Sequence, residues 1–360
     1  MKSLMRYLSF GAASVLLLAI GCGVNPSSPG SLEPTGDAAS IVYVIQDDFN
    51  TETSSILELP ANAQGNVAPS ATLNSPASTI FYAAAVDQSG NLYVGAETEV
   101  VNPNAVFEIF EYAAGATGAA TPMRTIDIPV GVVSLAVDET GQIYALTQDG
   151  IYVFAANSSG NATPIRWILP GESTSITSIY YPFGIAVDEQ QNIYVANATN
   201  ILVFSSTANG NVAPVKTITW PTAQYGIADG VAVDANGDIF ASNYLNNCPV
   251  SPYSCTSSSQ ILKFAPGANG AVTPTNTLTI LPNSSFPSAS TGANGVAVDG
   301  AGNLYTQVIT TTNLGLGLPG WTDAMSVEVF STGQTGSSAP AQTITSTAWT
   351  DSDSYGLAVY

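Results

Sequence analysis

The chain has 360 residues, of which 26 are acidic and 6 are basic, and its formal charge at pH 7 is −20. Phosphate backbones and anionic lipid surfaces repel a protein of this charge, so the composition argues against a nucleic-acid partner. Only 9% of the residues are charged, and a surface solvated by neutral polar side chains is typical of an exported protein.

The first predicted element is an export signal over residues 1–21. Lys2 and Arg6 supply positive charge, residues 8–20 form an apolar run, and a small-residue stretch ends at Cys22. This pattern resembles a bacterial lipoprotein signal, so we expect cleavage before Cys22 and lipidation of its thiol. A transmembrane anchor is the alternative, although a spanning helix needs about 20 apolar residues.

Residues 22–40 contain several Pro, Ser and Gly residues and are expected to form a flexible tether behind the lipidated cysteine. The protein would then contact the membrane only through its lipid anchor. Its location would be the periplasmic or cell-surface side of a bacterial membrane.

Residues 41–360 repeat one cycle of about 50 residues. Each cycle has an Ala-Val-Asp strand, a turn, an aromatic-bearing strand, a third apolar strand and a Gly-x-x-x-Pro motif that opens a fourth strand. Clear copies of the first two strands cover residues 184–196 and 230–242. Four antiparallel strands repeated radially predict an all-β fold, a six-bladed β-propeller with four-stranded blades. The small alanine places the first strand nearest the axis, and the proline places the fourth at the rim.

The two ends of the repeated region predict how the ring closes. Residues 355–360 have the pattern of an innermost strand, and residues 41–45 that of a second strand with no innermost strand before it. Pairing of these N- and C-terminal strands would complete the sixth blade and leave no free sheet edge.

The turns between first and second strands begin with Asp, as in residues 87–91 and 299–303. We expect each Asp to accept hydrogen bonds from backbone N–H groups two or three residues further on, and Gly to supply a positive φ. A calcium loop would need more oxygen ligands than each turn provides, so the structural role is favoured.

The motifs Gly-(Val/Ile)-Ala-Val-Asp and Asn-(Ile/Leu)-Tyr-Val resemble those of the NHL repeat family over about residues 41 to 360. The resemblance implies a six-bladed propeller with a binding function, although some related propellers, such as gluconolactonases, are enzymes. The gluconolactonase-type metal site uses Glu, Asn and Asp, and this sequence shows no clear match for the early Glu. Virginiamycin-type and peptide-amidating lyases rely on histidine, which this chain lacks.

Cys248 and Cys255 lie in one predicted loop. In an oxidising compartment we expect them to form a disulfide, which would stabilise the loop by about 2–3 kcal/mol. Zinc is the alternative, but the chain has no histidine and no third free cysteine to complete a tetrahedral site.

Loop lengths predict which face of the propeller binds a ligand. Second-to-third loops and blade-to-blade crossings vary in length and share one face, here named the variable-loop face; variable loops on a rigid scaffold commonly carry binding groups. Aromatic and carboxylate side chains there suit a sugar or a peptide, or else pack the loops down. The ligand-binding candidates are Tyr181, Tyr225, Asp229, Tyr244, Trp321, Asp323, Trp349 and Tyr355.

Ring closure would also bring Asp47 and Asp48 close to Asp351 and Asp353. Carboxylates gathered in this way repel one another unless a cation lies among them. The sequence therefore predicts a calcium site of weak affinity, with a Kd on the order of 10⁻⁴–10⁻³ M. A pair of solvated polar loops is the alternative, and no other cofactor is expected.

These features favour a monomeric, non-enzymatic binding or scaffolding propeller of the cell envelope, with a glycan, a peptide or a protein as its ligand. The lack of histidine excludes Ser/His/Asp and Cys/His catalytic sets. The alternative is a divalent-metal hydrolase or lyase with its site at the axial mouth of the propeller.

The lipidation hypothesis makes a direct prediction. Cys22→Ser removes the acylated thiol but leaves the tether, so the variant should leave the membrane fraction and keep the melting temperature of the parent. Fractionation after high-salt and carbonate washes tests this, and a variant that stays in the washed membranes contradicts the lipoprotein assignment.

Overall fold

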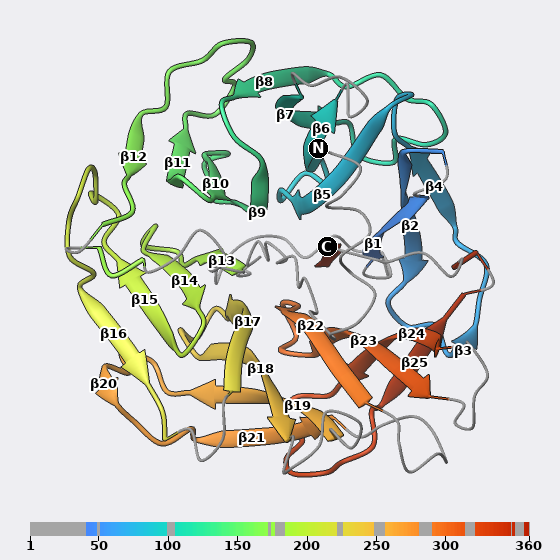
Figure 1. Cartoon of the computed structure of the whole chain (residues 1–360), viewed down its shortest axis with the longest axis vertical. Coiled ribbons are helices and arrows are strands. Elements are labelled where there is room, and N and C mark those ends of the chain that lie inside the picture. The colour runs from blue at the N-terminus through green and yellow to red at the C-terminus, as the bar shows by residue number, and fades with distance from the viewer. Residues whose placement is uncertain are drawn as a thin grey trace.

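The computed structural model describes residues 41–48, 51–98, 105–171, 174–176, 184–221, 226–247, 256–280, 290–313, 321–346, 348–349 and 356–359. These residues form β-strands and no helix, and the strands surround a common centre, with the C-terminal strand β26 close to it (Figure 1). The prediction of an all-β, propeller-type fold is confirmed. In particular, the described part of the chain offers no apolar helix of the length needed to cross a bilayer.

Hydrogen bonding arranges the strands in five sheets, one of which has eight strands. Its strands, in hydrogen-bonded order, are β26 (Gly356–Val359), β1 (Ile41–Asp48), β2 (Thr53–Pro60), β5 (Thr79–Val86), β6 (Leu92–Thr98), β7 (Val106–Tyr112) and β8 (Arg124–Ile128), with β4 (Ala71–Asn74) beside β2.

Two sheets have four strands and two have five. The first contains β9 (Val132–Val137), β10 (Ile143–Thr147), β11 (Gly150–Phe154) and β12 (Arg166–Ile168). The second contains β13 (Gly184–Val187), β14 (Ile193–Asn197), β15 (Asn200–Phe204), β16 (Lys216–Thr219) and β20 (Gly270–Ala271). The third contains β17 (Gly226–Val233), β18 (Ile239–Asn247), β19 (Thr256–Phe264) and β21 (Asn276–Ile280). The fourth contains β22 (Ser290–Val298), β23 (Leu304–Asn313), β24 (Trp321–Phe330), β25 (Gln342–Thr345) and β3 (Gly65–Asn66).

The predicted count of six separate four-stranded blades is not confirmed by this hydrogen bonding. The eight-stranded sheet consists of two four-strand groups, β26-β1-β2-β4 and β5-β6-β7-β8, which are joined by one parallel residue pair, Thr53 with Thr79. In the first group β26 pairs antiparallel with β1, and Val42 lies opposite Val359.

The innermost strands crowd one another near the centre, as the small alanines predicted. The alanine shared by these strands is at most 2% exposed in every copy. Two residues earlier β13, β17 and β22 have glycines, and a Cβ added to Gly230 would lie 2.6 Å from the Cα atom of Gly295 in the next sheet. Because that distance is far below van der Waals contact, only glycine lets these backbones approach so closely.

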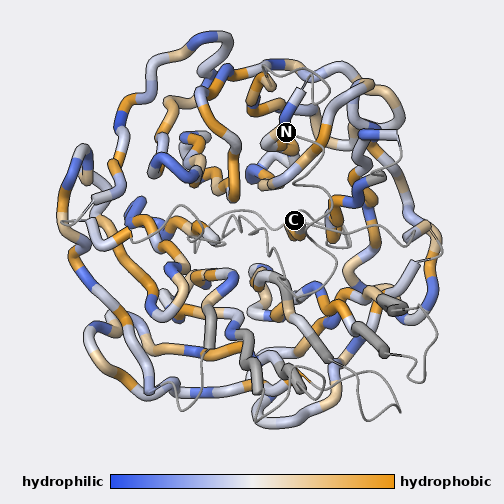
Figure 2. The backbone as a smooth tube through the Cα atoms, in the orientation of Figure 1, coloured by the Kyte–Doolittle hydropathy of each residue, from blue (hydrophilic) through white to orange (hydrophobic). Residues whose placement is uncertain are grey.

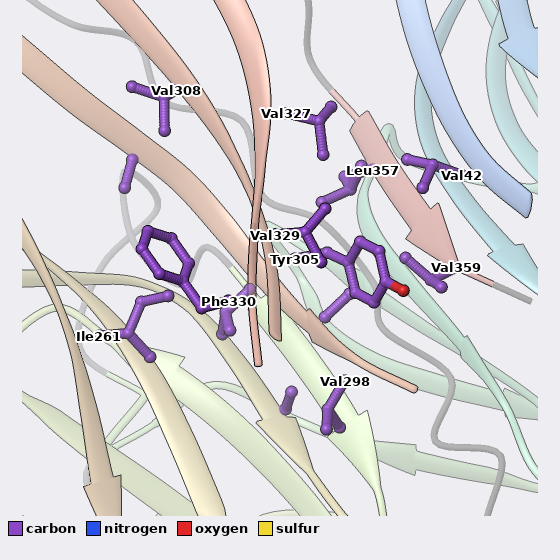
Figure 3. Packing of buried hydrophobic residues seen from close by; sticks show 14 of the residues in the cluster. Val42, Ile261, Val298, Tyr305, Val308, Val327, Val329, Phe330, Leu357 and Val359 are labelled. Atoms are coloured by element: carbon purple, nitrogen blue, oxygen red, sulfur yellow. The ribbon is translucent and has the colours of Figure 1, made fainter. Parts of the chain in front are cut away.

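The hydrophobic core lies between neighbouring four-strand groups rather than inside any one of them. In Figure 2 apolar segments run along the strands, while polar segments lie mainly in the connecting turns. One cluster joins strands from both ends of the chain: Val42 of β1, Leu357 and Val359 of β26, and Val327 and Val329 of β24 (Figure 3). No sheet can therefore bury its apolar faces without its neighbours.

At the outer rim, the glycine of each Gly-x-x-x-Pro motif forms a parallel bridge to the outer strand of the preceding four-strand group. The bridged pairs are Leu73 with Gly118, Ile126 with Gly160, Ile168 with Gly210, Ile218 with Gly270, Leu278 with Gly336, and Ile344 with Gly65. In Figure 1 the last of these appears as β3 beside β25. All of these glycines have a positive φ, which explains the residue type.

The Asp-initiated turns have the structural role that the sequence predicted, with one difference in spacing. The carboxylate of Asp188 accepts hydrogen bonds from the backbone N–H groups of Gln190 and Asn192, which are two and four residues further on, rather than two and three. Its second oxygen accepts from the hydroxyl of Tyr194 at 3.0 Å. The aromatic residue of the second strand thus ties the turn to the sheet.

Substitutions at two glycines separate the cost of backbone strain from the cost of steric crowding. Gly210→Ala should cost about 1–2 kcal/mol, because an added Cβ meets no atom within 4 Å but φ is +73°. Gly210→Asn should cost less, since Asn tolerates positive φ. Gly230→Ala should cost as much as Gly210→Ala or more, because its Cβ meets backbone atoms. Urea unfolding measures all three, and a Gly230→Ala variant as stable as the parent would contradict the packing described here.

Candidate functional site

One repeated position of the innermost strands lies on the side of the buried alanine away from the Asp-initiated turn, toward the variable-loop face. It lies three residues before the buried alanine of each innermost strand, and in β5, β9 and β17 a register shift leaves it as the extra residue of a β-bulge. The residues there are Tyr82, Val133 and Asp229; Asn294 holds the position in β22, at another irregularity. Bulges of this kind re-aim side chains at functional sites.

Asp229 is the residue at this position whose chemistry is most unusual. It is 2% exposed, and neither carboxylate oxygen has a hydrogen-bond partner within the described part of the chain. Burial raises the pKa of this carboxyl well above its ordinary value. A buried carboxylate without a donor is costly, so its retention points to a missing partner.

Two neighbouring side chains in β18 also have unfilled acceptors. Asn243 lies opposite Ala228, and Ser242 lies opposite Gly230, so the two residues flank the bulge that carries Asp229. Both are buried, and the Ser242 Oγ and Asn243 Oδ1 atoms have no hydrogen-bond partner among the described residues. Three side chains around one bulge therefore leave oxygen atoms unsatisfied.

At the equivalent positions in β10 and β14, polar side chains have local partners. Thr147 and Asn197 hold the place of Asn243 in β10 and β14. The Thr147 hydroxyl donates to the backbone oxygen of Gly150 at 2.9 Å, and the Asn197 amide donates to Asn200 Oδ1 at 3.1 Å. In those two copies the polar residue bonds within its own loop, whereas the carbonyl oxygen of Asn243 has no hydrogen-bond partner among the residues that the structure describes.

Further acidic side chains surround Tyr82, the counterpart of Asp229 in β5. The Tyr82 hydroxyl donates to Glu97 Oε2 at 2.9 Å. Burial, and then the charges of Glu97 and Asp47, raise the pKa of Tyr82. Asp47 is buried and accepts a hydrogen bond from Ser54, so it also helps to hold β1 and β2 together. Tyr82 is thus surrounded by acidic side chains from β1 and β6.

The structure tests only some of the residues predicted from the sequence. Trp349 is half-buried and packs against the cluster that joins both ends of the chain. Tyr244 lies in β18, Trp321 and Asp323 in β24, and Asp48 in β1, but the positions of these four side chains are not among those described. Cys22, Tyr181, Tyr225, Cys248, Cys255, Asp351, Asp353 and Tyr355 lie outside the described residues.

The candidate metal sites receive no direct support. The described residues include no group of three or more Cys, Asp or Glu side chains placed to hold an ion. A pocket of about 170 Å³ lies at the opposite face, between the turns of the β17 and β22 sheets. Its acids are already engaged, since Asp238 pairs with Lys263 at 2.6 Å and Asp299 accepts hydrogen bonds within its own turn. We therefore place the candidate site at the axial mouth.

Sequence reasoning included Asp229 but missed Tyr82, Val133, Ser242 and Asn243. Alignment of the innermost strands on their alanines would have identified Tyr82 and Val133 as counterparts of Asp229. Nothing in the sequence marks Ser242 and Asn243, since similar polar residues in β10 and β14 have local partners.

No family model matches the chain, and no curated protein matches it. A structure of the mitotic checkpoint complex aligns with 78% of this chain and 95% of its own, at 13% identity and a TM-score of 0.42. A mutant of the GH43 protein BlXynB from Bacillus licheniformis aligns with 73% of this chain, at 12% identity and a TM-score of 0.36, and this chain spans 56% of its length.

Replacement of Asp229 should stabilise the protein in a pH-dependent way. The pKa of this carboxyl is higher in the folded state than in the unfolded state, so its ionisation destabilises the fold. The destabilisation is absent below the unfolded-state pKa, grows as pH rises, and is complete above the folded-state pKa. Asp229→Asn should therefore raise the melting temperature at pH 7–8, by about 2–4 °C per kcal/mol relieved, and have little effect near pH 4.

The exposed Asp149 provides a matched control, because Asp149→Asn should change the melting temperature little at either pH. Glu328, whose pKa burial raises to about 7, adds a similar trend to every variant, so each variant is compared with the parent at the same pH. An Asp229→Asn variant no more stable than the parent at pH 8 would contradict the uncompensated carboxylate.

Proposed function

We propose that this protein is a non-enzymatic binding propeller of the bacterial cell envelope, which captures a glycan, peptide or protein ligand at the axial mouth of its variable-loop face. One observation carries the proposal: among the described residues, the side-chain oxygens of Asp229, Ser242 and Asn243 have no hydrogen-bond partner around the bulge of the innermost strand β17. Ligand sites commonly present a few polar groups from a rigid scaffold.

The proposal includes a closed ring of six blades that acts as the rigid scaffold. Its support is the cyclic order of the rim bridges, in which the outer strand of each four-strand group contacts the glycine of the next and Ile344 contacts Gly65. The antiparallel pairing of β26 with β1 supports the same closure at the centre. The single pair between Thr53 and Thr79 is then a contact between two blades.

The remaining sequence predictions belong to the same proposal. They are an NHL-type repeat, a lipid anchor at Cys22, a disulfide between Cys248 and Cys255, a monomeric state, and a weak calcium site among Asp47, Asp48, Asp351 and Asp353. A short tether between the lipid and the ring would hold the binding face near the membrane while leaving it open to a ligand.

A glycan and peptide array probed with the purified full-length chain tests the function. Val133→Arg adds bulk and charge at the mouth position of β9, so it should abolish binding to every hit. Asn236→Arg places the same side chain on an exposed turn of the opposite face and should leave binding unchanged. Hits that survive Val133→Arg, or that are lost in Asn236→Arg, would contradict a site at the axial mouth.

A further inference from the structure

One position of the repeat departs from its copies at the rim of the β9–β12 sheet. It is the residue directly before the rim-bridged residue of each outer strand, and in five four-strand groups it is threonine. These residues are Thr72, Thr125, Thr217, Thr277 and Thr343. In β12 the residue is Trp167, which is 39% exposed. Within the described part of the chain, it is the one aromatic residue among the exposed large hydrophobic side chains.

Two contacts hold the indole ring of Trp167 in a fixed orientation. It stacks on Tyr152, the residue opposite it in β11, with ring centroids 5.1 Å apart and an interplanar angle of 19°. Its Nε1–H donates to the backbone oxygen of Asp149 at 3.1 Å. Because Tyr152 covers one face of the indole and the residue is well exposed, the opposite face is open to a ligand.

Burial of the ring beneath Trp167 does not require a tryptophan. In the preceding four-strand group the residue at the place of Tyr152 is Phe110, and Thr125 lies opposite it. Phe110 and Tyr152 are each 5% exposed, so a threonine accompanies the same degree of burial. The indole therefore adds apolar surface that the core does not need, and exposed aromatic rings are enriched at binding interfaces.

Hydrogen-bonding groups border the indole. Asp149 is exposed and lies in the turn that accepts from the indole N–H. Burial, and then the charge of Asp149, raises the pKa of Tyr152, so this carboxylate lies within electrostatic reach of the stacked rings. Asn209, also exposed, accepts through Oδ1 from the backbone N–H of Trp167 at 2.9 Å, a bond that does not use its amide N–H groups. One flat apolar face thus has an acceptor and a donor nearby.

We propose that Trp167, Asp149 and Asn209 form a binding site at the rim, on which one pyranose ring of a glycan stacks. A pyranose with equatorial hydroxyl groups presents its axial C–H bonds as a flat apolar face, which matches the indole. Its hydroxyl groups donate and accept hydrogen bonds around the edge of that face. Strand β12 lies at the outer edge of the ring of strands (Figure 1), so this site is separate from the axial mouth.

Other ligand classes fit this surface less well. Quaternary ammonium groups are bound by cages of several aromatic rings, and cation–π attraction to one exposed ring is weak. An anionic ligand would be repelled by the carboxylate of Asp149. An apolar partner protein needs a continuous apolar patch, whereas polar side chains border the indole here.

Isothermal titration of the full-length chain tests the proposal with three β-1,4-linked tetramers: cellotetraose, mannotetraose and chitotetraose. Tetramethylammonium tests a cation, and cyclohexanol tests apolar contact without a set of hydroxyl groups. We expect at least one tetramer to bind more tightly than these two probes. Trp167→Thr installs the residue of the other five groups and should weaken tetramer binding about tenfold or more. Trp167→Tyr keeps a ring and should weaken it less.

Matched variants keep loss of folding separate from loss of binding. Trp167→Thr should unfold in one transition as the parent does, because threonine is accommodated at the same place in five groups. Asp149→Asn keeps the indole and should weaken binding about threefold, because a charge-assisted hydrogen bond becomes a neutral one. Val215→Thr removes another exposed apolar side chain at the rim of the next sheet and should leave binding unchanged.

Several results would overturn the rim site. They are tetramers that do not bind the parent, a Trp167→Thr variant that binds them as the parent does, and a Val215→Thr variant that loses binding equally. Concentration-dependent dimerisation that Trp167→Thr abolishes would assign the indole to a protein interface instead, and would overturn the proposal as well.

The rim site and the function proposed for the axial mouth fail separately. Tetramer binding that is lost in Val133→Arg and kept in Trp167→Thr would support the mouth and overturn the rim site. Tetramer binding with the opposite dependence would support the rim site. Because rim binding would survive Val133→Arg, the array test of the mouth is performed in the Trp167→Thr background, where hits indifferent to Val133→Arg contradict the proposed function alone.

Discussion

The backbone bridges of the rim glycines are the interaction on which the rest of the structure depends. The apolar clusters lie between sheets, so burial of each sheet requires its neighbours at a fixed distance and angle. A glycine in the left-handed conformation, such as Gly160 or Gly210, turns the chain so that its N–H and carbonyl groups bond to the previous outer strand. The N–H of Gly160 donates to Thr125 at 2.6 Å, and its oxygen accepts from Asp127 at 2.9 Å. The motif thus satisfies edge groups that would otherwise invite pairing with another chain.

At the inner end of each sheet the opposite constraint applies, since there the strands are too close for ordinary side chains. Gly184, Gly230 and Gly295 approach one another backbone to backbone, and the following alanines are buried. At the bulge next to these residues the strands are less crowded, and the residue type differs from one strand to the next. Residues as different as Tyr82, Val133 and Asp229 occupy that position in similar strands. A repeated scaffold can therefore change its binding chemistry at one position while the packing around it stays the same.

Asp229 shows the tension between stability and binding at such a position. A hydrophobic residue of similar size would avoid the cost of a buried carboxylate, and polar residues at places that match Asn243 in β10 and β14 bond to their own loops. Within the described part of the chain, the acceptors around β17 have no partner of this kind, so a ligand that supplied donors would offset their cost. Buried polar groups without hydrogen-bond partners are expected at functional sites for this reason.

The sequence by itself determined the strand order, the aromatic second strands, the Asp turns, the small residues near the centre and the proline-bearing rim. Each of these depends on neighbours within one repeat, and the repeat shows them several times. Only the tertiary structure decided that the rim glycines bridge successive four-strand groups and that Trp349 packs against the core. It also decided that Asp229 is buried with no donor among the described residues, while Asp47 accepts from Ser54. The physical reason is that burial and hydrogen-bond partnership arise between residues far apart in the chain, as Gly230 and Gly295 are, and no local pattern encodes those distances.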